Sequence, residues 1–419
     1  MMNSFVRPNE PLKVALIGAG QRSRTVYAPL LPWLTPWVQV VAVCDPVREH
    51  ADNLAKMLDV PAFYDIRDLV KARPMEAAIV VTPIPSHHSI SVYLSSHGVH
   101  NLVETSWCSM IIQARDMIET AKKNNVLVRV AENFFRFPID RLVQAIKANG
   151  FLGDIKRIVS YNDHTGFHNN SRWIVFAGSH PTWVQSVEHT MPTVAFHSTP
   201  ERFHQDETYR ARFFWFADNL LVMDHAANIK GFLGRQMRPG LTEWQGARGT
   251  VVWSSPDGKT WTGVGEVRYL SDVALPTSRG IADQVFPIIM EQSEGQWDRI
   301  YVDLPVGRLG YDNRFMGMSL GPTYHRHPWY GVPVAEHIVD FALAVKGLRP
   351  SEFNEHDALM SLMMEIGARE SALHEGRRLA LPLSGDLEAD SIERAKQKSL
   401  YGVDPMDVEA MLAISYPKP

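Results

Sequence analysis

The chain has 419 residues, of which 45% are apolar and 21% are charged, and its formal net charge is −4. This is the composition of a globular protein, and the length suggests two or three domains. The charge indicates no basic nucleic-acid surface, and no apolar run approaches the roughly 20 residues of a membrane span. The first ten residues lack the apolar core of a signal peptide. Cys44 and Cys108 lie in apolar surroundings, which predicts reduced, buried thiols and a cytoplasmic protein.

The first third of the chain alternates apolar strands with helices. Strands are predicted at 14–17, 38–43, 77–81, 101–103 and 126–130. Helices are predicted at 25–33, 48–57, 87–97 and 111–123, with Ser86 as the cap of the third. Continuous apolar strands separated by helices indicate a parallel sheet that is covered on both faces.

The segment between the first two predicted strands has the order of a dinucleotide site. A strand ends in Gly18-Ala19-Gly20, a helix follows, and the next strand ends in Asp45. Gly18 allows a tight turn, Gly20 lets a pyrophosphate approach the amides of the helix start, and Asp45 can bind a ribose diol. Because Asp45 would repel a 2′-phosphate, NAD is favoured over NADP. Ser23 stands at the third fingerprint position, usually Gly or Ala, so a strand–turn–helix that binds no nucleotide is the alternative.

The pattern changes after Pro138. A helix at 141–149 is followed by short alternating strands at 155–161, 210–216, 220–224, 250–253 and 267–270, and then by helices at 333–346 and 355–375. Such alternation is typical of an antiparallel sheet with one covered face. We therefore predict an α/β Rossmann domain at 1–136, then an α+β domain with an open, mainly antiparallel sheet at 137–387. The late helices of that domain are expected to pack back on the Rossmann domain, and 388–419 form a C-terminal extension.

The order of these motifs resembles the glucose–fructose oxidoreductase / inositol dehydrogenase family (Gfo/Idh/MocA). The resemblance rests on Gly18 to Arg22, on Thr82-Pro83 with His87, on Glu104-Thr105-Ser106, on Phe135-Arg136-Phe137-Pro138 and on His189. It implies a nicotinamide-binding Rossmann domain and a sheet domain that contacts the substrate and often forms the oligomer interface, hence a homodimer or homotetramer. Most members oxidise or reduce a carbinol of a sugar, cyclitol or sugar derivative. The implied cofactor residues are Gly18, Gly20, Gln21, Arg22, Ser23, Asp45, Thr82, Pro83, His87, Glu104 and Thr105.

The departures from the family pattern affect the chemistry. Members usually carry Glu-Lys-Pro after the fifth strand, and that Lys contacts the reacting hydroxyl. Here Thr105 takes its place, and a threonine hydroxyl can position a ribose but supplies no cation. The family histidine corresponds to His189, whereas the Asp four residues before it is Gln185. Histidine titrates near neutral pH, so we predict His189 as general base, with Gln185 to orient it and Tyr161 as a further catalytic candidate. A structural histidine is the alternative.

A segment rich in polar and aromatic residues follows the strand at 155–161 and is predicted as a substrate-binding loop. Aromatic faces combined with hydrogen-bond donors suit a polyhydroxylated ligand, although an ordinary polar loop is the alternative. The predicted substrate residues are Arg136, His164, His168, Arg172, Trp173 and His180. The pairs His164/His168 and His325/His327 lack a third ligand in a compact motif, so no metal is predicted.

Three functions follow from these residues. The leading prediction is an NAD-dependent oxidoreductase acting on a sugar-derived alcohol, without nucleic acid or membrane partners. The first alternative is an NAD-dependent glycosidase that oxidises a sugar hydroxyl, eliminates the aglycone, adds water and reduces the sugar again. The second is a non-catalytic nucleotide-binding protein. The lost lysine motivates both alternatives.

Overall fold

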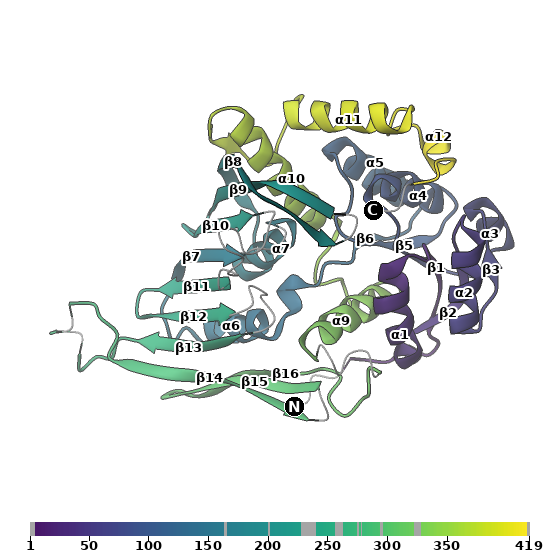
Figure 1. The fold of residues 1–419 in the computed structure, drawn as a ribbon. Coiled ribbons are helices and arrows are strands. Elements are labelled where there is room, and N and C mark those ends of the chain that lie inside the picture. The colour runs from purple at the N-terminus through teal and green to yellow at the C-terminus, as the bar shows by residue number, and fades with distance from the viewer. Residues whose placement is uncertain are drawn as a thin grey trace. The chain divides into compact units, whose positions relative to one another are not determined.

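The computed structural model describes residues 5–162, 166–199, 202–227, 240–255, 263–274, 276–277, 279–293, 296–321 and 328–416. The chain forms two compact units: unit 1 comprises residues 1–133, 314–362 and 386–419, and unit 2 comprises 134–313 and 363–385. Each unit is built on its own sheet (Figure 1). None of the helices in the described part of the chain has the length and apolarity needed to cross a membrane.

Unit 1 contains a six-stranded sheet in the order β3-β2-β1-β4-β5-β6, and all of its pairings are parallel. The strands are β1 (Leu12–Ile17), β2 (Val38–Cys44), β3 (Ala62–Phe63), β4 (Ala77–Val80), β5 (His100–Val103) and β6 (Val128–Val130). Strand β4 is buried throughout, as expected of a strand that is covered on both faces. The predicted Rossmann fold is confirmed.

Helices cover both faces of this sheet, because the chain winds from β1 towards β3 and then from β4 towards β6 in the opposite direction. The helices of unit 1 include α2 (Arg48–Leu58), α3 (Ile66–Ala72), α4 (Ile84–Ser96), α5 (Ile111–Lys123), α9 (Pro328–Val345), α11 (Glu388–Tyr401) and α12 (Val408–Leu412). Helix α9 contacts β2 and β5, although it lies some 200 residues or more along the chain from both. The predicted bounds of α5 are matched at both ends.

Two predicted features of unit 1 are wrong. The helix expected at 25–33 is divided into a π-helical turn η1 (Ser23–Tyr27), α1 (Ala28–Leu30) and a 3-10 turn η2 (Leu31–Leu34), because Pro29 and Pro32 lack amide donors. Ser86 is not the cap of α4, which begins two residues earlier at Ile84. Pro85 is the second residue of α4 and has a backbone angle suited to a first helical turn, so Ser86 lies inside the helix.

Unit 2 contains an eleven-stranded sheet in the order β16-β15-β14-β13-β12-β11-β7-β10-β9-β8-β17. The strands are β7 (Ile155–Asn162), β8 (Pro181–Thr199), β9 (Arg202–Phe216), β10 (Leu221–Ala227), β11 (Gly240–Gly246), β12 (Gly249–Ser255), β13 (Val264–Tyr269), β14 (Gln284–Ser293), β15 (Gln296–Leu304), β16 (Gly307–Asp312) and β17 (Leu379–Ala380). Only the β7–β10 pairing is parallel among those described, which confirms the predicted open, mainly antiparallel sheet.

One face of this sheet is covered by helices and the other is open. The covering helices are α6 (Pro138–Asn149), α7 (Gly166–Ala177) and the second half of α10 (Glu355–Leu373). Along β8, Val184 and Ser186 are buried against α10, whereas Val187 points to the open face and is 56% exposed. Helix α7 replaces part of the predicted substrate loop, so that prediction is wrong for 166–177. Its polar residues Asn169 to Arg172 are buried, and buried partners favour the helix over the loop that its polarity suggested.

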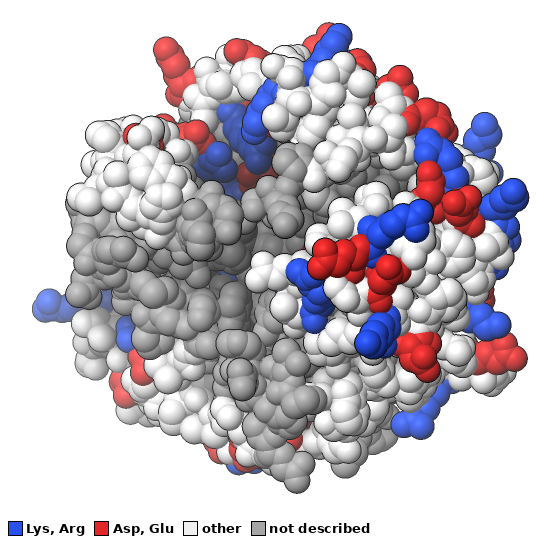
Figure 2. Space-filling model, turned by 45° about the vertical axis from the view of Figure 1, so that its right-hand side comes forward, with Lys and Arg blue, Asp and Glu red and all other residues white. Residues whose placement is uncertain are grey.

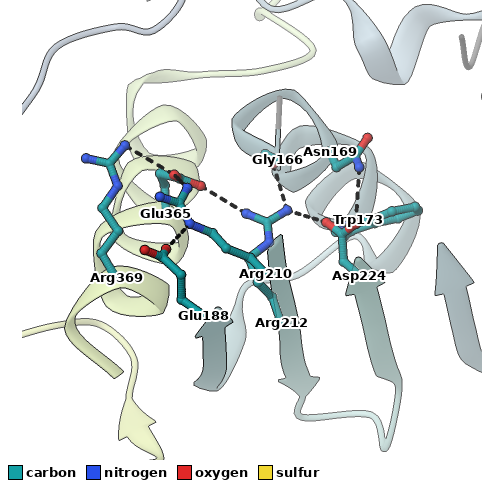
Figure 3. A network of polar contacts seen from close by, with 9 residues as sticks. All are labelled: Gly166, Asn169, Trp173, Glu188, Arg210, Arg212, Asp224, Glu365 and Arg369. Carbon is teal, nitrogen blue, oxygen red and sulfur yellow. Dashed lines mark hydrogen bonds and ion pairs between the residues drawn. The ribbon is translucent and has the colours of Figure 1, made fainter. Parts of the chain in front are cut away.

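A buried set of charged groups, the Asp224 network, joins this sheet to two of its helices (Figure 3). Asp224 on β10 accepts hydrogen bonds from Arg212, from Asn169 Nδ2 at 3.2 Å and from Trp173 Nε1 at 3.3 Å. Arg212 also donates at 2.9 Å both to Glu365 on α10 and to the carbonyl of Gly166 at the start of α7. The outer members are Glu188, Arg210 and Arg369. The network therefore fixes α7 and α10 to the sheet.

Candidate nucleotide site and acid–base residues

The turn after β1 has a shape that only glycine permits. Gly18 has φ +93°, and a Cβ atom there would lie 2.2 Å from the carbonyl oxygen of Val81. A Cβ atom on Gly20 would instead meet nothing within 4 Å. Gly18 thus allows the strand to turn against the loop after β4, and Gly20 leaves open space beside the start of the helix, where a phosphate can approach backbone amides.

Two side chains hold this turn. The Ser23 hydroxyl donates to the Gly18 carbonyl at 2.5 Å, so the serine at the third fingerprint position closes the turn. Asp45 Oδ2 accepts from the Ala19 amide at 2.7 Å, and its Oδ1 accepts from the Val47 amide at 2.8 Å. Each carboxylate oxygen keeps a lone pair for a ribose hydroxyl. The open space, the amides and this carboxylate fit the pyrophosphate and ribose of a dinucleotide; Gln21, the first residue after the turn, is exposed.

His87, predicted as a cofactor residue, holds two loops at the same edge of the sheet. Its ring nitrogens lie 2.8 Å from the carbonyl oxygen of Thr82 and 2.9 Å from that of Ser106. The side chain is completely buried, and burial lowers the pKa of His87 despite the two carbonyl partners. Thr82 and Pro83 retain exposed surface. The structure therefore places His87 behind the loops after β4 and β5, where it acts on the backbone.

A second buried set, the Glu104 cluster, follows β5 and comprises Glu104, Arg22, Tyr27, Thr105 and His337. Glu104 Oε1 accepts from Arg22 Nε at 2.7 Å and from the Tyr27 hydroxyl at 3.0 Å. Its Oε2 accepts from the amide of Thr105 at 2.8 Å and from its hydroxyl at 3.1 Å. The Tyr27 oxygen lies 3.4 Å from His337 Nε2. The carboxylate thus has four donors, two of them from Thr105, at the position of the family lysine.

The electrostatics of the Glu104 cluster exclude two of its members as bases. Burial alone would raise the pKa of Glu104, but the charge and hydrogen bond of Arg22 lower it to about 2. Burial also raises the pKa of Tyr27 well above its usual value, and the Glu104 charge adds to this effect. At neutral pH Glu104 is therefore a fixed anion and Tyr27 a neutral donor. No local pattern in the sequence indicates Tyr27 or His337, because His337 lies 310 residues from Tyr27 in the chain and reaches the cluster on α9.

In unit 2, two predicted catalytic residues lie on the open face of the sheet. Tyr161, at the end of β7, stacks on His225 of β10 with ring centroids 4.4 Å apart. His225 Nδ1 lies 3.0 Å from the hydroxyl of Tyr209, and Tyr209 is paired directly across from His189 on β8. Directly paired residues share a face, so Tyr161, His225, Tyr209 and His189 all point to the open side. His189 is exposed, and the sequence had not indicated His225 or Tyr209.

Gln185 does not orient His189. Its amide nitrogen donates to the carbonyl of Gly376 at 2.7 Å. Gln185 and His189 lie four residues apart on β8, which corresponds to about 13 Å along a strand. The predicted contact is therefore not formed, and the pair does not act as a unit.

The predicted substrate residues are divided between the interior and the surface of unit 2. Arg172 Nε donates to Asp140 at 2.9 Å, and its guanidinium lies over Trp173. Both are buried, and burial raises the pKa of Asp140 even though Arg172 opposes the shift. Packing explains Arg172 and Trp173 without a ligand, so their substrate role stays a prediction that their burial does not support.

The other members of that set differ in exposure. Arg136 is buried with its guanidinium over the ring of Phe135. His168 stacks on Phe134 at 4.2 Å and keeps part of its surface exposed, as does His180 between α7 and β8. His164, His325 and His327 lie outside the described residues. The structure therefore leaves His168 and His180 as the partly accessible members of the predicted set.

Cysteine and metal chemistry receive no support from the described residues. Cys44 and Cys108 are buried, as predicted, and burial raises the pKa of Cys44 to about 12. Within the described ranges, no three His, Cys, Asp or Glu side chains come together as metal ligands. On the described surface drawn in Figure 2, basic and acidic side chains are interspersed.

Comparison with known proteins identifies the first domain. Residues 12–132 match the model of the Gfo/Idh/MocA family, described as an oxidoreductase family with an NAD-binding Rossmann fold. Residues 12–132 thus have the NAD-binding Rossmann domain of the Gfo/Idh/MocA family.

Curated relatives match a part of the chain. The D-glucoside 3-dehydrogenase of Escherichia coli (strain K12) is 30% identical over 149 residues, which are 35% of this chain and 42% of that protein. The D-apiose dehydrogenase of Paraburkholderia graminis is 25% identical over 147 residues, or 34% of this chain and 37% of that protein. The matches thus span less than half of these relatives.

Solved structures share the fold of both units at low sequence identity. A levoglucosan dehydrogenase in complex with NADH and levoglucosan has a TM-score of 0.63 at 16% identity, covering 89% of this chain and 100% of that one. An oxidoreductase from Agrobacterium radiobacter in complex with NAD+, L-tartaric acid and magnesium has a TM-score of 0.61 at 15% identity, covering 88% and 98%. These likenesses concern the fold alone.

Proposed function

We propose that this protein is an NAD-dependent oxidoreductase that acts on a carbinol of a sugar, cyclitol or sugar derivative. The proposal rests on the turn after β1. There the backbone conformation at Gly18 requires a glycine, Gly20 faces open space, and Asp45 is held beside them. The names of the two curated relatives, a glucoside and an apiose dehydrogenase, support a carbohydrate substrate.

Oxidation of an alcohol carbon removes a hydride from carbon and a proton from oxygen, so the reaction needs an acceptor for each. When bound, NAD supplies the hydride acceptor. The proton requires a base with a pKa near the working pH, and Glu104, with a pKa of about 2, is too weakly basic. We assign proton transfer to His189 on β8. Tyr161 and His225 lie on the same sheet face but on β7 and β10, with Tyr209 of β9 between His225 and His189. The Thr105 hydroxyl donates to Glu104 and so offers its oxygen as an acceptor to a ligand hydroxyl.

The test combines cofactor binding with turnover on a panel of sugars, cyclitols and their glycosides. Wild type is expected to bind NADH and to form NADH from NAD+ with at least one alcohol of the panel. Gly20→Ala is expected to retain wild-type stability, because its Cβ meets nothing, and to lose roughly 10- to 100-fold in NADH affinity, because it occupies the phosphate approach. Gly18→Ala, the matched variant, is expected to lose both stability and affinity. Absence of NADH binding to wild type would refute the proposal.

The same panel distinguishes the two alternative functions. A redox-assisted glycosidase would hold NAD tightly, cleave glycosides and accumulate no NADH. Thr105 at the lysine position motivates that reading, whereas the relatives named above are described as dehydrogenases and oxidoreductases. A non-catalytic nucleotide-binding protein would bind NADH and turn over no member of the panel.

We also propose that a second copy of the chain covers the open face of the large sheet. Val187, Val285 and Ile289 on this face are each more than a third exposed, and an exposed apolar sheet favours association. Light scattering after size-exclusion chromatography is expected to give the mass of a dimer or tetramer, and Val187→Glu is expected to lower it. A wild-type mass equal to that of one chain would contradict this assembly.

A further inference from the structure

The carboxyl end of β6 holds a buried acceptor that no described residue satisfies. Asn133 follows β6, is 2% exposed, and its Oδ1 has no hydrogen-bond partner among the described residues. The Asn133 side chain also forms a hydrogen bond with Tyr330, and this bond favours the ionised form of the phenol. A donor is needed to favour the ionised form, so the Asn133 amide nitrogen donates this bond. A buried carbonyl oxygen without a donor costs free energy. Asn133 Oδ1 therefore calls for a donor supplied by a ligand.

Arg22 brings a positive charge to the same tyrosine. Its guanidinium carbon lies 5.3 Å from the ring centroid of Tyr330 and 5.9 Å from that of Tyr27. Glu104 holds the Nε atom, and the Arg22 side chain remains 36% exposed. Glu104 thus anchors Nε, and a side-chain hydrogen bond joins Arg22 to Tyr330. A guanidinium has five N–H groups, so others can bind an acceptor beside Tyr330.

The place of these groups in the sheet selects one part of the cofactor. Strands β5 and β6 are neighbours, with the Ala131 amide donating to the Val103 carbonyl at 2.8 Å, so Glu104 and Asn133 both lie just beyond the carboxyl ends. A dinucleotide on this fold crosses the carboxyl ends of the strands with one nucleotide on each side of β1. Asp45 after β2 marks the adenosine side. Arg22 and Asn133 therefore belong to the nicotinamide side.

We propose that Arg22 and Asn133 together bind the carboxamide group of the nicotinamide ring. Arg22 donates to the carboxamide oxygen, and Asn133 Oδ1 accepts from the carboxamide NH2. A carboxamide presents one acceptor and one donor side by side, which matches this pair. A pyrophosphate presents acceptors only and would leave Asn133 Oδ1 unsatisfied. This inference rests on the proposed NAD-dependent function and adds two residues that select the oxidisable ring.

The test measures dissociation constants of three ligands for the full-length protein. The ligands are NADH, its acetylpyridine analogue, in which a methyl group replaces the carboxamide NH2, and ADP-ribose, which lacks the ring. Wild type is expected to bind NADH roughly tenfold more tightly than the analogue. Asn133→Leu is expected to lose this preference and to bind both reduced ligands equally. Arg22→Met is expected to weaken both by roughly tenfold or more, because both retain the oxygen. Neither variant should change the affinity for ADP-ribose.

Several results would overturn the assignment. Equal affinity of wild type for NADH and the analogue would remove the role of Asn133, and this comparison needs no variant. A loss of ADP-ribose affinity in Arg22→Met would place Arg22 on the pyrophosphate instead. If Asn133→Leu does not fold, Asn133→Asp, which keeps an acceptor, is expected to retain a preference for NADH. Failure of wild type to bind either NADH or ADP-ribose is a different result, because it refutes the proposed function itself.

Discussion

The Glu104 cluster in unit 1 and the Asp224 network in unit 2 are built from the same chemistry. In each, a buried carboxylate accepts hydrogen bonds from an arginine and from aromatic or polar side chains. They differ in what lies beyond the carboxylate. The side chains of Asp224 and Arg212 are at most 1% exposed, whereas that of Arg22 is 36% exposed. The Asp224 network is thus shielded from solvent, whereas the Glu104 cluster has an arginine that is accessible to a ligand.

Their positions in the two sheets explain this difference. The Asp224 network lies between the sheet and α7 and α10, and its arginine joins both helices to the strands. The Glu104 cluster lies beyond the carboxyl ends of parallel strands, where ligands bind in open α/β sheets, and Asn133 nearby has an unsatisfied acceptor. A buried ion pair alone therefore does not distinguish a structural joint from a binding site. The binding site is instead distinguished by an exposed arginine and an unsatisfied acceptor at the carboxyl edge of the sheet.

The largest effect is expected from Asp224→Ala, which leaves Arg212 buried without its main partner. Breaking a buried ion pair in this way costs about 3–5 kcal/mol, and we expect a loss of that size in the free energy of unfolding measured in urea. Asp303→Ala is the matched control, because its pair with Arg308 is exposed, and little change is expected there. Folded Asp224→Ala protein should bind NADH like wild type. A loss below 1 kcal/mol would show that the Asp224 network does not fix α7 and α10 to the sheet.

The second effect concerns the pH dependence of Glu104. Its pKa is lowered from 4.5 to about 2 in the folded state, so the ionised cluster contributes stability above pH 4.5, and this contribution is lost as the pH falls towards 2. The shift corresponds to on the order of 3 kcal/mol.

Urea unfolding of wild type and Glu104→Gln at several pH values isolates this contribution from that of other carboxylates. The difference between the two proteins should be largest above pH 4.5 and should shrink as the pH is lowered below it. A difference that is constant between pH 7 and pH 3 would mean that Glu104 titrates normally in the folded state. Glu104→Gln should also weaken NADH binding, in contrast to Asp224→Ala, because it releases Arg22.

The nucleotide turn was predictable because its signals are local. Gly18, Gly20, Ser23 and Asp45 are spaced along one strand–turn–helix–strand segment, and the structure brings them together. The Rossmann strands were equally evident as continuous apolar runs. The first helix was predicted wrongly, since Pro29 and Pro32 divide it into short turns.

The rest of the site depends on contacts that no local pattern records. His337 and Tyr330 arrive on α9 from a distant part of the chain, and Asn133 is marked by an unsatisfied atom that only the fold reveals. The polar residues of 166–177 predict a loop instead of helix α7, because buried polar residues resemble surface residues in sequence. Arg172 is buried and not accessible to a ligand, although the polar and aromatic composition of its segment predicts a ligand contact.

The smallest change in stability is expected from His189→Ala, which tests whether the open face of unit 2 contributes to the chemistry. His189 is exposed on β8, so the free energy of unfolding should change by less than about 0.5 kcal/mol. If His189 transfers the proton, kcat should fall by roughly 10² or more while the affinity for NADH is unchanged. His225→Ala is the matched variant: it loses the stacking on Tyr161 and the hydrogen bond to Tyr209, and so should cost more stability. An unchanged kcat in His189→Ala, with a lowered kcat in His225→Ala, would move the base from the family position on β8 to the Tyr161–His225 pair.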